Sequence, residues 1–527
     1  MSFLLLIRRL FARSDRYQTL LFWAAVSMLF CLYGSVAFFS YGFDDEFHNI
    51  RIVENLQFFD GMSYVQSNDV HPPLSYAYNY LLYWLSGSWP IVRVIGGIAL
   101  VASISWYSIC SWRRDGWENG ILFLLFTGLN PAILMWGTSV RWYSLYLIIL
   151  FWMLAPQGHA SKARSDLNTS THRLNWVHLK PVLCLLLLGY TGYITIVLAI
   201  PFMIFYYYYS VRLTDKIISA CGITLTAFFA LYSHQLYIFA TVHYLGKDSQ
   251  ASSFFKSAIG FAVAEISNQG VFPLSLVGGI STMSLIAFSL CVAYSFSAQK
   301  TKYKGLLVSY ILSCSFLVMT GLAGKFRNFV IIDPLKSACI ALFDAKSCRG
   351  GRFAGKAAYC SMALILFSQM YGIANVVTHT GTTKNNWNIP AGEVFNIVRK
   401  VSSECPGGLA IFSHEPLFDW HFQRLGYSAY GPYGKRHFET KDNAPQCAIF
   451  INTFRGSVPT YRFANMKIER YDAVKNSRVT TKRIGRDSDY IAKRQLDPDF
   501  PEYNVELIDA RGNLDLSRLE NWQPMNK

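Results

Sequence analysis

Long apolar segments recur along the first 377 residues, and they constrain the fold more than any other feature of the chain. About 20 apolar residues in a row are enough for a helix to cross a bilayer. The first such segment covers roughly residues 20–40, and the others cover roughly residues 89–112, 119–137, 141–155, 181–209, 217–240, 271–297, 305–323, 326–343 and 357–377. The pattern predicts a multi-pass α-helical membrane protein.

Composition and charge agree with a membrane protein. Of the 527 residues, 52% are hydrophobic and 15% are charged, whereas a soluble domain carries about a quarter charged residues. The net charge of +16 comes from basic residues in short clusters between apolar segments, which is typical of membrane orientation and not of nucleic-acid binding. Basic residues precede the first segment and acidic residues follow it, so we expect a cytoplasmic N-terminus and an outer loop over residues 41–88.

The number of spans depends on residues 181–209, a stretch too long for one ordinary crossing and short for two. Two crossings, bent near residues 189–192, place the basic clusters at 300–304 and 346–356 on the cytoplasmic side. A single crossing places both clusters outside, against the usual charge bias. We therefore predict about eleven spans, with the C-terminus outside.

The composition changes near residue 378, where apolar runs shorten and charges of both signs appear throughout. Residues 1–377 are predicted to form the membrane domain, and residues 378–527 a separate soluble domain of α/β or α+β class on the outer face. Its expected elements are a helix over 392–402 and strands over 408–412 and 447–451. Cys405 and Cys447 are its only cysteines. In an oxidising compartment they can pair, and two unpaired thiols fit the sequence equally well.

Three consecutive acids, Asp44, Asp45 and Glu46, follow the first apolar segment directly. Acidic residues beside a bilayer indicate function by default, and a carboxylate there can act as general base towards an acceptor hydroxyl. The alternative is that they cap a helix that begins near Phe47, since aspartate is a favoured N-cap residue. Capping explains one aspartate but not three acids in a row. The three are therefore the candidate catalytic residues.

The sequence His71-Pro72-Pro73 is a rigid element in the same loop. The first proline disfavours helix at His71, and prolines suit the first turn of a helix. A helix over residues 74–85 is therefore expected, with His71 at its entrance. A divalent metal is also compatible with this loop, because carboxylate oxygens bind hard cations; the sequence leaves this open, with Asp44, Glu46, His48 or His71 as its ligands.

Three basic residues are predicted at outward-facing ends of spans: Arg141, Lys325 and Arg327. Cations on the outer face run against the usual charge bias. Arginine presents a planar donor fork that suits phosphate oxygens, so these positions indicate binding of a lipid phosphate. The alternative for each residue is snorkelling of the side chain to the headgroups.

Taken together, these elements resemble the GT-C superfamily of polyprenyl-phosphate-sugar-dependent glycosyltransferases, in particular the branch of protein O-mannosyltransferases and the lipid A aminoarabinose transferase. The resemblance covers roughly residues 20–340. It rests on an Asp-Glu pair (Asp45-Glu46), an HPPL element (His71 to Leu74), an Arg-x-Tyr element (Arg141 and Tyr143) and a basic-aromatic element before a proline (Arg327-Asn328-Phe329 and Pro334).

The resemblance implies an inverting transfer of a sugar from a polyprenyl-phosphate donor to an acceptor hydroxyl. Asp45 would deprotonate the acceptor and Glu46 would orient it, with Asp44 as the other candidate base. The donor phosphate and substrate would be bound by His71, Arg141, Tyr143, Lys325 and Arg327. The acceptor is a glycolipid, a polysaccharide or a protein, and the expected location is the bacterial inner membrane. No nucleotide sugar is needed, in agreement with the lack of a glycine-rich phosphate loop.

Other functions are compatible with a chain of this kind. A flippase or transporter of lipid-linked saccharides would have many spans, with charges at mid-membrane and repeat symmetry. An O-antigen-type polymerase or ligase would use outer-loop arginines in place of an Asp-Glu pair. A structural subunit that recruits partners through residues 378–527 would not need Asp45.

Overall fold

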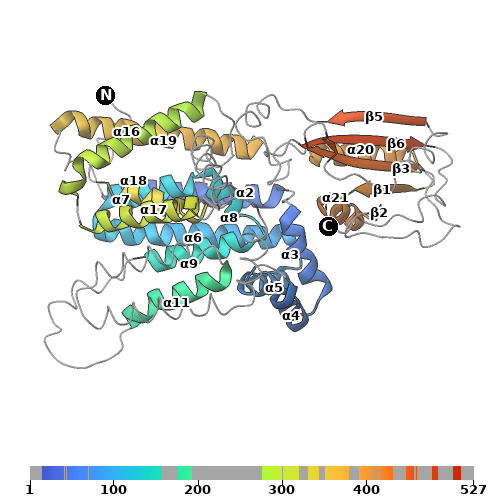
Figure 1. Cartoon of the computed structure of the whole chain (residues 1–527), viewed down its shortest axis with the longest axis horizontal. Helices are drawn as coiled ribbons and strands as arrows, with labels where there is room; N and C mark the ends of the chain where they lie inside the picture. The colour runs from blue at the N-terminus through green and yellow to red at the C-terminus, as the bar shows by residue number, and fades with distance from the viewer. Residues whose placement is uncertain are drawn as a thin grey trace. The chain divides into compact units, whose positions relative to one another are not determined.

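The structure is a computed structural model of the whole chain (Figure 1). It describes residues 15–40, 42, 44–68, 71–155, 176–192, 276–299, 301–319, 330–343, 351–378, 391–405, 408–413, 416–430, 447–455, 458–459, 478–484 and 503–511.

The described residues form two compact units. The first unit contains Met1–Phe38 and Ile52–Val377, and the second contains Phe39–Arg51 and Thr378–Lys527. The division after Val377 falls where the composition of the chain changes. The short stretch Phe39–Arg51, which carries the three consecutive acids, belongs to the second unit although it lies early in the sequence.

The first unit is helical (Figure 1). Its described helices are α2 (Asp15–Phe39), the last turn of α3 (Asp44–Asn55), α4 (Phe58–Asn68), α5 (Leu74–Ser86), α6 (Trp89–Asp115), α7 (Trp117–Gly128), α8 (Pro131–Gly137), α9 (Trp142–Leu154), α11 (Trp176–Thr191), α16 (Leu276–Ser295), α17 (Thr301–Met319), α18 (Asp333–Ala341) and α19 (Gly351–Thr378).

Helices α6, α7 and α9 pack along one another in this unit. The rings of Tyr107 and Phe123 lie 4.2 Å apart, and those of Phe123 and Phe151 lie 6.0 Å apart. Near the other end, Gly96 of α6 faces Ser144 of α9. Helices α6 and α9 therefore run parallel, with their N-terminal ends at the same end of the bundle.

Within the described residues, three helices are long and apolar enough to cross a membrane, and a fourth span results if a bent pair counts as one. The three are Arg16–Phe39, Trp89–Asp115 and Ala354–Ala374. Most of the expected spans over 181–209 and 217–240 lie outside the described residues. The total of eleven spans stays a prediction.

The expected span over residues 119–137 is not one continuous helix, which corrects the sequence-based expectation. It is broken into α7 and α8, which meet at an angle of 61°. Pro131 cannot continue the helix, because it lacks an N–H and disfavours helical backbone at the residue before it. Asn130 caps the new helix by accepting hydrogen bonds from the backbone N–H groups of Ala132 (2.9 Å) and Ile133 (3.2 Å).

The described part of the expected span over 326–343 is also interrupted. A short turn over residues 330–332 precedes α18, whose nine residues are far fewer than the roughly 20 that a crossing needs. Pro334 explains the break, since proline fits the first turn of a helix but not its interior. Helix α11 ends at Thr191, inside the stretch where a bend is expected.

The second unit contains a six-stranded mixed sheet (Figure 1). The strands are β1 (Leu409–Ser413), β2 (Ser428–Tyr430), β3 (Cys447–Arg455), β4 (Val458–Pro459), β5 (Arg478–Ile484) and β6 (Tyr503–Arg511). Their order is β2-β1-β3-β6-β5, with β4 paired to β3. Strands β1, β2 and β3 are parallel, whereas β6 is antiparallel to both β3 and β5.

Two helices accompany the sheet: α20 (Ala391–Ser403) and α21 (Pro416–Arg424). Helix α20 buries Val394, Phe395, Val398 and Val401, which is the spacing of one helix face. Phe395 lies against α21, 4.9 Å from the ring of Phe422. Helix α21 joins β1 to β2. Because these strands are parallel, they require a crossover connection, and α21 provides it.

Candidate active site

The acidic triplet forms the first turn of α3, which begins at Asp44. The expectation of a helix that begins near Phe47 was wrong by three residues. Negative charges are favourable in a first helical turn, because the unpaired N–H groups there carry partial positive charge. Glu46, the third acid of this turn, is fully buried.

Hydrogen bonds join the C-terminal end of α3 to the helices that follow it. The Tyr80 hydroxyl lies 2.9 Å from the carbonyl oxygen of Ile52 and 3.1 Å from that of Leu56. Burial, and then the charge of Asp60, raise the pKa of Tyr80 to about 12. The indole N–H of Trp89 donates to Glu54 Oε1 at 2.7 Å. Glu54 is thus tied to the start of α6.

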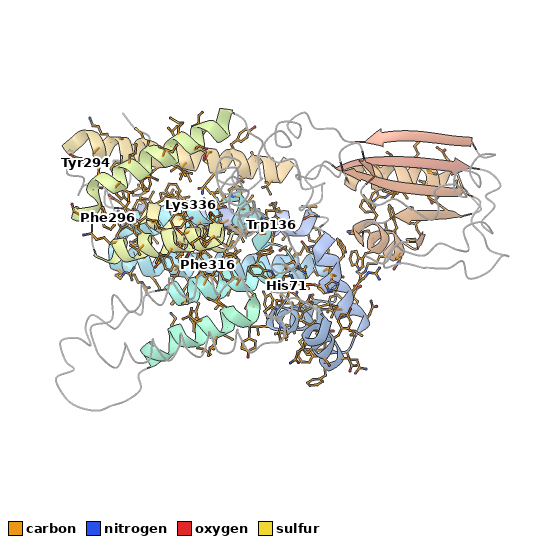
Figure 2. The ribbon with its side chains drawn as sticks, viewed as in Figure 1. His71, Trp136, Tyr294, Phe296, Phe316 and Lys336 are labelled. Atoms are coloured by element: carbon orange, nitrogen blue, oxygen red, sulfur yellow. The ribbon has the colours of Figure 1, made fainter. Side chains whose placement is uncertain are left out.

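Helix α5 begins at Leu74, directly after His71-Pro72-Pro73, as predicted. His71 lies at its entrance (Figure 2). The Nε2 atom of His71 is 2.7 Å from Nη2 of Arg141, although the two residues are 70 positions apart in sequence. Because arginine stays protonated and can only donate, His71 accepts this hydrogen bond through Nε2.

Arg141 is the N-cap residue of α9 and has an extended backbone. Its side chain is 6% exposed. The N-terminus of a helix adds partial positive charge to that of the guanidinium, and such an end suits an anion. Tyr143, the other residue of the Arg-x-Tyr element, is buried between two indoles, with its ring 4.2 Å from that of Trp142 and 5.7 Å from that of Trp136.

Sequence reasoning missed further polar residues at this end of the bundle. Arg93 is 3% exposed and lies one turn before Gly96 on α6. Because α6 and α9 run parallel, Arg93 and Arg141 belong to the same end of this helix pair. A virtual Cβ on Gly96 would lie 3.8 Å from Ser144 Oγ and 3.9 Å from the Tyr78 hydroxyl. The signal in the sequence was an arginine inside an apolar helix.

Lys325 and Arg327 lie outside the described residues. The segment that follows them is tied to α9, because the Tyr146 hydroxyl donates to the carbonyl oxygen of Ile331 at 3.0 Å. The next helix, α18, begins with the buried Asp333, which pairs with Lys336 at 3.1 Å. Figure 2 labels Lys336 in this unit.

The metal hypothesis gains no support from the described side chains. Among them, no three His, Cys, Asp or Glu residues lie close enough together to bind a metal ion. His71 directs Nε2 at a guanidinium, which is a poor neighbour for a cation.

No protein-family model and no curated protein matches the chain. Among solved structures, it is similar to the crystal structure of ArnT from Cupriavidus metallidurans bound to undecaprenyl phosphate. The identity is 9%, the match covers 94% of this chain and 98% of ArnT, and the TM-score is 0.47. A likeness this distant carries no argument about function.

Proposed function

We propose that the chain is an inverting glycosyltransferase of the GT-C type. It moves a sugar from a polyprenyl-phosphate donor to a hydroxyl of a glycolipid, polysaccharide or protein acceptor, on the outer side of the membrane. The observation that carries the proposal is the 2.7 Å contact between His71 and Arg141. Both residues were singled out from the sequence as phosphate-binding candidates, and the fold brings them together.

Arg141 is the group that binds the donor phosphate in this proposal. His71 holds one arm of its guanidinium, and the remaining N–H groups can donate to phosphate oxygens. Lys325 and Arg327 are proposed to add positive charge. Cations held in place before the reaction stabilise the negative charge that develops on a leaving phosphate. Arg93, at the same helix end, adds to this positive potential.

Asp45 is proposed as the general base. It removes the proton of the acceptor hydroxyl, and the oxygen attacks the anomeric carbon from the face opposite the phosphate. The bond between that carbon and the phosphate oxygen breaks, and its electron pair leaves with the lipid phosphate. The configuration at the anomeric carbon is thereby inverted. Glu46, buried next to Asp45 in sequence, supports the base.

The surface of α4 and α5 supports a substrate that arrives through the lipid. Large apolar side chains are exposed there, among them Phe59 (82%), Trp84 (80%) and Leu85 (62%). Neither helix contains a basic residue, and Asp60 is their only charge. Aromatic side chains of this kind are enriched at membrane interfaces.

The state of Cys405 supports an outer location for the second unit. Cys405 is disulfide-bonded, and Cys447 is the only other cysteine of residues 378–527. Disulfides persist in oxidising compartments and are rare in the cytosol. We propose a Cys405–Cys447 pair and a periplasmic second unit.

Sugar transfer in membranes supplied with radiolabelled polyprenyl-phosphate sugars tests the function. Wild type is compared with Asp45→Asn, Asp44→Asn and the matched control Asp60→Asn, an exposed acid of the same loop, at equal amounts of protein. We expect Asp45→Asn to lower transfer by at least about 100-fold, as removal of a general base does, and the control to match wild type. Equal transfer by Asp45→Asn and wild type would remove Asp45 as the base. Movement of labelled lipid across the membrane without transfer would indicate a flippase.

A further inference from the structure

We infer that an aromatic seat on the C-terminal part of the chain positions the acidic first turn of α3. The seat consists of Phe395, Trp420 and His421, and Phe47 is the side chain that it receives. The inference rests on the proposed function, because it treats the turn of Asp44, Asp45 and Glu46 as the place of the base. It assigns to residues 391–424 a role in the reaction that the sequence motifs do not suggest.

Phe47 fits closely against this seat. It is fully buried, and its ring lies 5.3 Å from that of Trp420 and 5.7 Å from that of His421. The interplanar angles are 55° and 65°, which are the tilted and edge-on geometries that aromatic pairs prefer. All three residues belong to the second unit.

The residues of the seat also contact one another. The rings of Trp420 and His421 meet edge to face at 4.7 Å, and the ring of Phe395 lies 5.3 Å from His421. Arg424 lies on the same helix as Trp420, and its guanidinium is 4.5 Å from the centre of the Trp420 ring. Helix α21, which carries three of these residues, follows β1 and precedes β2. The seat is therefore fixed to the sheet.

Anchoring Phe47 fixes the turn that precedes it. Asp44 lies three positions before Phe47, so the two are neighbours on one helix face, and Asp45 and Glu46 lie between them. A helix of 12 residues is marginal without tertiary contacts. The rotation and tilt of the acidic turn thus depend on where Phe47 is held. A base displaced by about 1 Å can cost a factor of about 100 in rate.

The first test compares Phe47→Ala with wild type for kcat and for the donor KM. We expect kcat to fall about 10-fold to 100-fold while the donor KM stays within about twofold, because His71 and Arg141 are untouched. Phe47→Leu, which keeps an apolar side chain, is expected to recover part of the loss. The matched control is Phe367→Ala, the loss of an exposed phenylalanine from α19. A kcat within about twofold of wild type for Phe47→Ala would overturn the inference.

The second test reads the docking without activity. Amide hydrogen exchange of residues 44–51 is measured in the full chain for wild type, Trp420→Ala and Phe367→Ala. We expect exchange of these amides to accelerate at least about 10-fold in Trp420→Ala and not in the control. Unchanged exchange in Trp420→Ala would refute the seat. Absence of sugar transfer by wild type, with accelerated exchange in Trp420→Ala, would refute the proposed function and leave the docking in place.

Discussion

The two units hold their candidate functional residues by different means. In the first unit, His71 and Arg141 meet through a short hydrogen bond between the entrance of one helix and the N-terminus of another. In the second unit, the acidic turn is held by ring contacts of Phe47 with α21. A hydrogen bond fixes two atoms, whereas ring contacts fix the position of a whole helix. The difference suggests that donor binding and proton removal can be disrupted separately.

The largest expected effect on stability tests what holds the second unit. Cys405→Ser removes a disulfide, and closing a loop of the length between residues 405 and 447 stabilises a fold by about 4 kcal/mol in the chain-entropy model. We expect the second unit to melt at a clearly lower temperature, and reductant to act in the same way on wild type. Thermal unfolding of the full chain measures this, with Cys360→Ser, a free and exposed cysteine, as control. Labelling of both Cys405 and Cys447 by a thiol reagent before reduction would contradict the proposed pair.

A middle-sized effect is expected at the contact between Trp89 and Glu54 in the first unit. Trp89→Phe keeps an aromatic ring but removes the donor to the Glu54 carboxylate, and hydrogen bonds to charged groups contribute about 1.5–3 kcal/mol. We expect the free energy of unfolding to fall by this amount. We also expect weaker binding of the polyprenyl-phosphate sugar, because the N-terminal end of α6 is then held less firmly. Trp106→Phe, a change at an exposed indole of the same helix, serves as the control. Equal stability of Trp89→Phe and wild type would show that the hydrogen bond between Trp89 and Glu54 does not stabilise the packing of α3 against α6.

The smallest effect is expected for Tyr80→Phe, which removes hydrogen bonds to the backbone of α3. One intramolecular hydrogen bond contributes about 1 kcal/mol. Because the folded pKa of Tyr80 is raised from 10.0 to about 12, the stability linked to its protonated form is complete below pH 10. It is lost as the pH rises towards 12. The free energy of unfolding is measured between about pH 8 and pH 12 for wild type, for Tyr80→Phe and for Tyr64→Phe, a control at an exposed tyrosine. It should fall more steeply with pH in wild type than in Tyr80→Phe. The same slope in both would assign it to other groups.

The local elements were predictable where the sequence contains strong signals. The prolines after His71 predicted the start of α5 at Leu74, and the apolar pattern predicted α6. The bend at Asn130-Pro131 was missed, although the same proline rule predicts it, because hydropathy averages over a short break. The contact of His71 with Arg141 required the tertiary fold, since no local pattern relates residues 70 positions apart.

The role of Phe47 could not have been predicted from the sequence. The local sequence predicts only that Phe47 belongs to a helix, and it does not indicate any tertiary partner. Its partners Trp420 and His421 lie more than 370 positions away. The assignment of residues 39–51 to the second unit is equally a property of packing. Long-range aromatic contacts of this kind have no periodic pattern, because each depends on a single pair of side chains.

In the proposed mechanism, Arg141, oriented by His71, binds the phosphate of a polyprenyl-phosphate donor. Binding of undecaprenyl phosphate to the purified full chain tests it most directly, with wild type, Arg141→Gln and Arg113→Gln compared. Arg113 is an exposed arginine in the last turn of α6, at the opposite end of that helix from Arg93. Loss of a buried charged partner costs about 2–5 kcal/mol. We therefore predict that Arg141→Gln binds undecaprenyl phosphate at least about 30-fold more weakly than wild type, and that the affinity of Arg113→Gln stays within about twofold of wild type. Equal affinity of Arg141→Gln and wild type would contradict the claim.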